Sequence, residues 1–552
     1  MPPAPQPRVP AWCRSTVVLP LVVGSAFFLI GVGFLLTTWT PIGDFAVAEL
    51  VIRHATRFVP LSGPYSADRG YNHPLPLVYL IQWLPYHLFG ERSSAGLATS
   101  IWWNGAWLTF LVWLTARLRM AWLGLAVLAA TAVLAARTPS LSLLMPWNPT
   151  LGLIPSVVLV FACWRLALGS HRYLPLVGGL SVWCVGAHLG FVPMVVPMVL
   201  AAVTSLVAVT VRRHGARKLL TMWRPAVIAV AVGLLLASPM IVDVVRNRSD
   251  SNPAHILDNG RADQSLPRVQ TEDVTKVLRA ELAIPPAWGR PDPAFTVIWN
   301  VHPPRFPWMV FIGAVAAVAA LRRKARGEVL AMGLSLLGLL GAVAGLATIT
   351  GQIQPWYLIP AHSASMALYA IVAWSGGRSI AHAVRTRRPA PATEKPWAPR
   401  VVALQSVVAM ALVVSIVPQL DSDVIHPPID GKIMQLTRAA TDALPAGSTV
   451  LLDGPIAIDG FYTAAIALQL DKAGFAVRVP WNQTYVFTDA LRLSDSTTPA
   501  HLVLKFSKGK ADPPAPDAVL LAEVDIGNLL YADLDRVSLW LLDSSHPGRK
   551  AS

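Results

Sequence analysis

Long apolar runs are the feature that most limits what this chain can fold into. The runs that approach or reach the ~20 residues needed to cross a bilayer as a helix lie at about 16–38, 99–116, 121–136, 150–166, 174–190, 191–211, 224–240, 307–321, 328–349, 356–374 and 401–418. The chain is 54% hydrophobic and only 14% charged, which leaves too little polar surface for a soluble protein of this length. The sequence therefore predicts a polytopic α-helical membrane protein with about 11 spans.

The basic residues indicate the orientation of these spans. They are grouped in short blocks between apolar runs, at 116–119, 212–218, 322–326 and 385–400. This is the distribution of cytoplasmic loops under the positive-inside rule, so the net charge of +15 does not indicate a nucleic-acid partner. The pattern predicts a multi-pass protein of the plasma (inner) membrane with a cytoplasmic N-terminus.

This topology divides the chain into three parts. A cytoplasmic tail (1–15) precedes a membrane module (16–418), which includes a first extracytoplasmic loop (40–98) and a second long one (241–305). Residues 419–552 then lie outside, where strand-like runs at 448–454, 474–480, 500–506 and 517–525 alternate with helical patterns at 431–444 and 459–473. Strands alternating with helices predict a small α/β domain. It has no Gly-rich phosphate loop, which favours a binding or docking role.

The cysteines argue against disulfide and metal chemistry. Cys13, Cys163 and Cys184 lie in the N-terminal tail or in apolar segments, and no CxxC pair is present. We therefore expect no disulfide framework. No cofactor is indicated, and the sequence argues against an obligate metal site, though not against one assembled across loops.

The first extracytoplasmic loop carries an acid, Asp44, soon after the first apolar run. A helix that begins near Asp44 would be amphipathic and suited to lie flat at the membrane surface. Its apolar side would hold Phe45, Val47, Leu50, Val51 and Phe58, and its charged side Glu49, Arg53 and Arg57. Further along, Pro74 and Pro76 can open a second juxtamembrane helix, rich in aromatic residues.

The stretch "NHPLPLVYLIQWLPYHLFG" (72–90), together with the acid and the two juxtamembrane helices, resembles the GT-C superfamily of membrane glycosyltransferases. The likeness is to the protein mannosyltransferase, aminoarabinose transferase and mycobacterial arabinofuranosyltransferase type. This chain lacks the adjacent Pro-Pro and Asp-Glu pairs of some members. The resemblance implies a GT-C fold, a polyprenyl-phosphate-linked sugar as donor, and a cell-envelope glycan, lipid or protein as acceptor.

The resemblance also implies a catalytic residue. Asp44 matches the family's first-loop acid and is predicted as general base of an inverting transfer; alternatively it caps the juxtamembrane helix. Glu49 is a second catalytic candidate, with an ion pair to Arg53 as its alternative.

Other side chains are candidates for binding. The substrate-binding candidates are Arg53, His54, Tyr65, Asn72, His73, Trp147 and Asn148. The donor-phosphate candidates are Arg137, Arg246, Arg248, Gln354, Tyr357 and His362. Each could instead be an ordinary interfacial or solvated residue, and His188 is expected to be a buried histidine.

Two other functions are compatible with a membrane protein of this kind. A transporter or flippase of a lipid-linked glycan would typically show repeats and ionisable residues within its spans, whereas this sequence keeps its acids in loops. A non-catalytic envelope-assembly protein would not require an acid so close to the first span. The transferase is therefore the favoured interpretation.

Overall fold

The computed structural model describes most of the chain. The described residues are 15–66, 71–137, 143–259, 267–290, 306–351, 353–387, 398–417, 429–455, 460–480, 483–487, 491–492, 500–526 and 534–542. The chain forms two compact units. The first comprises Met1–Leu36, Leu97–Ile241 and Ala262–Leu420; the second comprises Thr37–Gly96, Val242–Arg261 and Asp421–Ser552.

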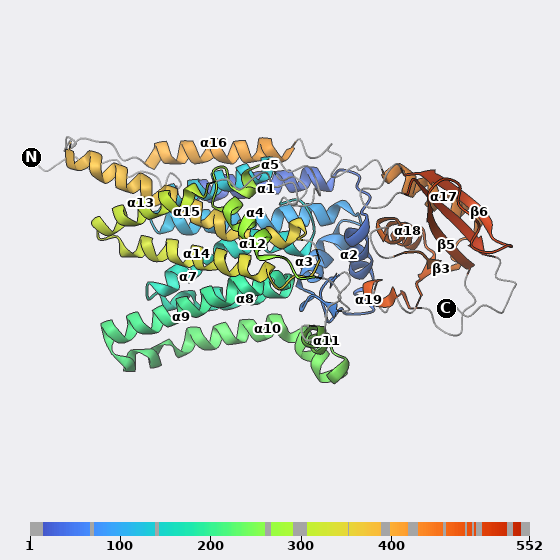
Figure 1. The fold of residues 1–552 in the computed structure, drawn as a ribbon, viewed down its shortest axis with the longest axis horizontal. Helices are drawn as coiled ribbons and strands as arrows, with labels where there is room; N and C mark the ends of the chain where they lie inside the picture. Colours follow the sequence, from blue (N-terminus) through green and yellow to red (C-terminus); the bar gives the residue numbers. More distant parts are fainter. Residues whose placement is uncertain are drawn as a thin grey trace, which may run out of the picture. The chain divides into compact units, whose positions relative to one another are not determined.

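The first unit is a bundle of long helices (Figure 1). Its main helices are α1 (Ser15–Leu35), α4 (Ser94–Arg117), α5 (Ala121–Arg137), α7 (Leu153–Ala167), α8 (Leu174–Ala187), α9 (Val192–His214), α10 (Trp223–Asn247), α13 (Trp308–Arg322), α14 (Arg326–Leu346), α15 (Ile359–Arg387) and α16 (Ala398–Ile416). Every predicted span corresponds to one of these helices. Short elements join them, including α6 (Asn148–Leu151), α12 (Thr271–Glu281), η7 (Ala287–Gly289) and η9 (Pro355–Leu358).

Within the described residues, six helical segments are long and apolar enough to cross a membrane. They are Val18–Leu35, Asn148–Ala167, Leu189–His214, Ala216–Asp250, Arg326–Leu346 and Pro355–Val384. Shorter apolar helices are Ala121–Arg137, Trp308–Arg322 and Ser406–Ile416. These segments agree with a multi-pass membrane protein, while the count of about 11 crossings stays a prediction.

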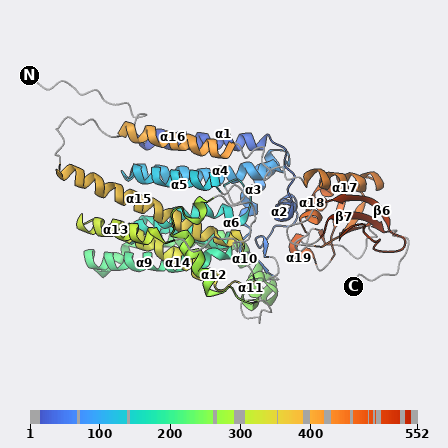
Figure 2. The same ribbon diagram turned by 45° about the horizontal axis from the view of Figure 1, so that its top comes forward.

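Glycines allow α1 and α4 to approach closely. A Cβ atom on Gly105 of α4 would lie 2.4 Å from Cγ of Phe27 on α1, and one on Gly31 would lie 2.2 Å from Nε1 of Trp102. Helices without a side chain at the crossing point can bring their backbones together, as is common in membranes. Figure 2 shows α16 beside α1, on which it also packs.

The second unit contains the predicted α/β domain. Its five-stranded sheet has the order β4-β3-β5-β7-β6, with β3 (Thr449–Asp453) parallel to β4 (Ala476–Arg478) and β5 (Ala500–Ser507). Strands β7 (Arg536–Leu542) and β6 (Val519–Asp525) continue it in antiparallel fashion. The sequence predicted four of these strands but not β7.

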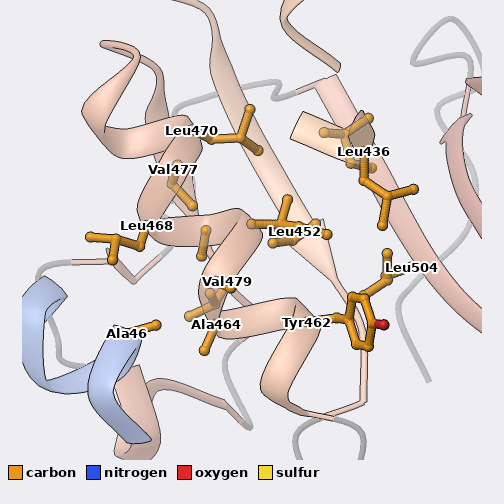
Figure 3. Close-up of a cluster of buried hydrophobic side chains, with 14 of the residues drawn as sticks. Ala46, Leu436, Leu452, Tyr462, Ala464, Leu468, Leu470, Val477, Val479 and Leu504 are labelled. Carbon is orange, nitrogen blue, oxygen red and sulfur yellow. The ribbon is translucent and has the colours of Figure 1, made fainter. Parts of the chain in front are cut away.

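One face of this sheet is covered by two helices, α17 (Asp430–Ala443) and α18 (Gly460–Lys472). Leu452 of β3, Leu504 of β5 and Leu436 of α17 meet in the core between them (Figure 3). Both helices lie close to their predicted bounds: α17 has one apolar face, whereas α18 is buried along most of its length.

The juxtamembrane helix α2 (Gly43–His54) joins this same core, which corrects two predictions. Its Ala46, Val47 and Leu50 are buried with the residues of α17, α18 and the sheet, and Figure 3 shows Ala46 pointing towards Ala464 of α18. This apolar side therefore packs on protein instead of lying against the membrane surface. The first loop also belongs to the second unit, whereas the sequence grouped it with the membrane module.

The predicted second juxtamembrane helix of the first loop is present. It is α3 (Leu77–Leu88), which packs on α2. Before it, β1 (Tyr65–Ser66) pairs with β2 (Tyr71–Asn72) as a short antiparallel hairpin that the sequence did not predict. The segment Val242–Arg261 adds α11 (Asn252–Asn259) to the same unit.

The close α1–α4 contact gives a first prediction. Gly105→Ala places a methyl group against the base of the Phe27 side chain and should cost about 1–3 kcal/mol of stability through overpacking. Gly33→Ala, in α1 where the added Cβ meets nothing within 4 Å, is the matched control. Thermal unfolding in detergent should show a lower midpoint for Gly105→Ala only; equal midpoints would contradict the packing described.

A second prediction concerns pH. Burial raises the pKa of Asp430 to about 7, from the ordinary 3.8, and its Oδ1 has no hydrogen-bond partner within the described part of the chain. The folded protein thus keeps this proton up to about pH 7, whereas the unfolded chain loses it near 3.8. Stability should therefore fall as pH rises through this window.

Asp430→Asn removes this titration. The difference in unfolding midpoint between pH 5 and pH 8 should become smaller than in the wild type, while the exposed Asp517→Asn leaves it unchanged. An unchanged difference in Asp430→Asn would contradict the assignment.

Candidate active site

Asp44 lies in the first turn of α2, directly after Gly43, whose backbone has a left-handed conformation. Gly43 has φ +51°, which a residue with a side chain rarely adopts, and the N-cap residue is Ile42, without a side-chain capping bond. The Asp44 Oδ1 accepts a hydrogen bond from Tyr65 Oη at 2.6 Å. Ile42 therefore occupies the N-cap position that the alternative interpretation gave to Asp44, and a phenol from β1 orients the Asp44 carboxylate.

A second tyrosine lies near the same carboxylate. Tyr79 of α3 is buried, and burial together with the neighbouring charge of Asp44 raises its pKa well above the usual range. Its hydroxyl therefore stays protonated at physiological pH. The segment that carried the family resemblance thus contributes a side chain to the surroundings of Asp44.

Glu49 has a different environment from Asp44. It is 5% exposed and accepts hydrogen bonds from Tyr86 Oη at 2.9 Å and Ser93 Oγ at 3.1 Å. It also forms an ion pair with Lys472 of α18. A buried carboxylate with three partners is suited to hold elements together, and burial beside Glu49 raises the pKa of Tyr86.

Arg53 and His54, predicted as substrate-binding residues, are engaged with the C-terminal domain. Arg53 Nε lies 2.7 Å from Asp471 Oδ2, and His54 Nε2 lies 3.1 Å from Asp471 Oδ1. Arg53 also pairs with Glu91 at 2.5 Å, so its acidic partners are these two residues and not the predicted Glu49. Burial raises the pKa of Asp471, but the hydrogen bonds from His54 and Arg53 outweigh it and hold that pKa below the ordinary value.

Asn72 and His73 serve to fix the hairpin. The Asn72 backbone donates to Asn252 Oδ1 at 2.7 Å, and Asn252 Nδ2 donates back to the Asn72 carbonyl at 3.0 Å. The backbone of Asn252 in turn donates to the buried Asp243 at 2.7 Å. His73 is buried, and its backbone bonds to Gly63 and Pro64. These contacts hold the start of the 72–90 stretch through its backbone.

The first unit brings together two of the remaining candidates. The rings of Trp147 and Trp356 lie 5.1 Å apart, and Tyr357 lies 5.7 Å from Trp356 and 6.3 Å from His188. These half-buried aromatic rings offer a surface on which a sugar or an isoprenoid could pack. Asn148, by contrast, is buried and donates to the carbonyl of Ala187 at 2.9 Å.

His362 is not placed to contact a donor phosphate. It is 4% exposed, and its Nδ1 lies 2.6 Å from Oε1 of Glu281, which is fully buried. Ser365 donates to the other oxygen of Glu281 at 2.5 Å and accepts from Trp288 Nε1 at 2.8 Å. A carboxylate partner repels a phosphate, so this environment does not favour the role predicted for His362, and the cluster ties α12 to α15.

The other donor-phosphate candidates are not brought together within one unit. Arg137 and Gln354 belong to the first unit, and Arg246 and Arg248 to the second. The three arginines are exposed, and Gln354 is half-buried at the start of η9. Among the described residues, no group of three or more His, Cys, Asp or Glu side chains is arranged to hold a metal ion.

Four residues around the site were missed by the sequence analysis: Tyr79, Asn252, Asp471 and Lys472. Tyr79 lies inside the quoted motif, where its spacing from Pro76 could have placed it on α3. The others come from distant segments, and no local pattern marks them.

Comparison with known proteins bears on the fold. No family model matches the sequence, and no curated protein does. Two similar solved structures are crystal structures of ArnT from Cupriavidus metallidurans, one bound to undecaprenyl phosphate and one in the apo state. Both have a TM-score of 0.52 and 14% sequence identity to this protein. The match to the bound structure covers 96% of this chain and 99% of the ArnT chain, and the match to the apo structure covers 97% and 99%, respectively.

ArnT is an aminoarabinose transferase of the GT-C superfamily. At this identity the similarity establishes the fold. The predicted polytopic helical membrane fold with a C-terminal sheet region is therefore confirmed, and it is similar to the fold of ArnT.

The Asn72–Asn252 pairing gives a prediction about the hairpin. Asn252→Ala removes the acceptor of the Asn72 amide and two donors to backbone carbonyls, at a cost of about 1–3 kcal/mol per buried group left unpaired. Hydrogen exchange at residues 71–73 should become faster in this variant. Asp258→Ala, at an exposed position of the same helix, should leave it unchanged. Equal protection in the two variants would show that the hairpin is held by other contacts.

Proposed function

We propose that this protein is a membrane glycosyltransferase that moves a sugar from a polyprenyl-phosphate donor to a cell-envelope glycan, lipid or protein on the extracytoplasmic face. The observation that carries the proposal is the carboxylate of Asp44, oriented by Tyr65 at the start of a juxtamembrane helix, within a GT-C-like fold. ArnT, which has this fold, is described bound to undecaprenyl phosphate. That description supports a lipid-linked donor here.

The chemistry asked of Asp44 is general base catalysis. The acceptor hydroxyl attacks the anomeric carbon as Asp44 takes its proton, so that the new glycosidic bond forms while the bond from the anomeric carbon to the phosphate oxygen breaks. The polyprenyl phosphate leaves with its electron pair, and the configuration inverts. The hydrogen bond from Tyr65 to Oδ1 fixes the carboxylate in one orientation, which lowers the entropic cost of the attack.

Glu49 is a poorer base in this scheme. Its ion pair with Lys472 and its hydrogen bonds from Tyr86 and Ser93 hold this buried carboxylate against protein partners, so an acceptor hydroxyl has little access to it. We therefore assign Asp44 alone as base and Glu49 as part of its support.

The test is sugar transfer by purified protein, with a panel of polyprenyl-phosphate-linked pentoses and hexoses and a mixed envelope-glycan acceptor. Asp44→Asn should lower turnover by about 100-fold or more through loss of the base, with polyprenyl-phosphate binding and thermal midpoint retained. Tyr65→Phe should cost about tenfold, as one hydrogen bond to a charged group is lost. Asp250→Asn, an exposed acid of the same unit, is the control.

Two results would contradict the proposal in different ways. Turnover that persists in Asp44→Asn keeps the transferase and moves the base elsewhere. Absence of turnover with every donor, in a wild-type protein that binds polyprenyl phosphate, points to a flippase or an assembly protein.

A further inference from the structure

The end of α18 carries two adjacent charges of opposite sign that meet complementary charges on α2. Asp471 faces Arg53 and His54, and Lys472 pairs with Glu49 and also donates to Ser93 Oγ at 2.5 Å. The side chains of Asp471 and Glu49 are 10% and 6% exposed, so these are not solvated surface pairs. Removing one partner of such a pair leaves the other charge buried and uncompensated.

The apolar contact between α2 and α18 is by itself weakly directional. Ala46, Val47 and Leu50 pack in a core to which α18 contributes small residues, among them Ala464 and Ala465. Small side chains permit close approach but tolerate sliding and rotation. The charge pairs remove this freedom, because a shifted register would place Asp471 near Glu49 and like charges would repel.

Asp44 lies off the face of α2 that α18 holds. The side of α2 that contacts α18 carries residues at helical spacing, namely Ala46, Leu50, Arg53 and His54. With a rotation of 100° per residue, Asp44 lies about 120° around the helix from Leu50. A rotation of α2 would therefore move the carboxylate away from Tyr65, which belongs to a different element, β1. The orientation of the proposed base therefore depends on the contacts that α18 makes with the other side of α2.

We propose that the C-terminal α/β domain acts as a clamp on the catalytic helix, with Asp471 and Lys472 as positioning residues for Asp44. This assigns the domain a role in the reaction in place of the binding or docking role that its sequence suggested. The catalytic consequence rests on the proposed function. The clamp itself is a statement about α2 that can be tested without any reaction.

The first measurement is hydrogen exchange of α2 (43–54) in the full-length protein. Asp471→Asn and Lys472→Met should each increase exchange across this helix, and Lys472→Arg should restore protection. Asp442→Asn, an exposed acid on α17 of the same domain, should match the wild type. Unchanged exchange in both Asp471→Asn and Lys472→Met would overturn the clamp, whatever the protein catalyses.

The second measurement separates positioning from simple stabilisation. In the transfer assay, Asp471→Asn and Lys472→Met should lower kcat about tenfold or more while KM for donor and acceptor changes less than about twofold, because a misplaced base impairs the chemical step more than binding. Lys472→Arg should recover kcat. Faster exchange with unchanged kcat would overturn the positioning role. A wild-type protein without transfer activity would instead refute the proposed function, and the exchange data would still decide the clamp.

Discussion

The contact between α2 and α18 is the interaction on which the second unit depends. It buries the apolar side of a juxtamembrane helix in the core of a domain whose other residues come from the far end of the chain. Arg53 with Asp471 and Glu49 with Lys472 then fix how the two helices meet. Burial of apolar surface is non-directional, whereas buried charge pairs are strongly directional. The apolar contact therefore contributes stability, and the charge pairs contribute orientation.

Helix α2 of the first loop has two roles, packing in a hydrophobic core and carrying Asp44. One side of α2 belongs to a hydrophobic core, and another side presents Asp44 to Tyr65 and the neighbourhood of Tyr79. The hairpin that carries Tyr65 is held through backbone bonds to Asn252, which the buried Asp243 supports. Three separate segments of the chain thus converge to orient one carboxylate. That is the preorganisation expected of a catalytic group.

The sequence predicted the regular elements well and their long-range partners poorly. Each span has a helix because a run of apolar residues has few alternatives in a membrane protein. In the C-terminal domain, β7 was missed because "RVSLWLL" (536–542) lacks a clear alternation. The amphipathic pattern of α2 was recognised, but an apolar face does not say whether lipid or protein covers it. Asp471, Lys472 and Asn252 could not be found because ion pairs and amide pairs across such sequence distances leave no local pattern.

The central claim is that sugar transfer takes place at Asp44. A cryo-EM structure of the protein in nanodiscs, bound to a non-hydrolysable polyprenyl-phosphate sugar analogue, tests it most directly. We expect the anomeric carbon to lie beside Asp44, with room for an acceptor hydroxyl within hydrogen-bond reach of the carboxylate still held by Tyr65. A sugar bound far from Asp44, with that carboxylate turned away from the ligand, would contradict it.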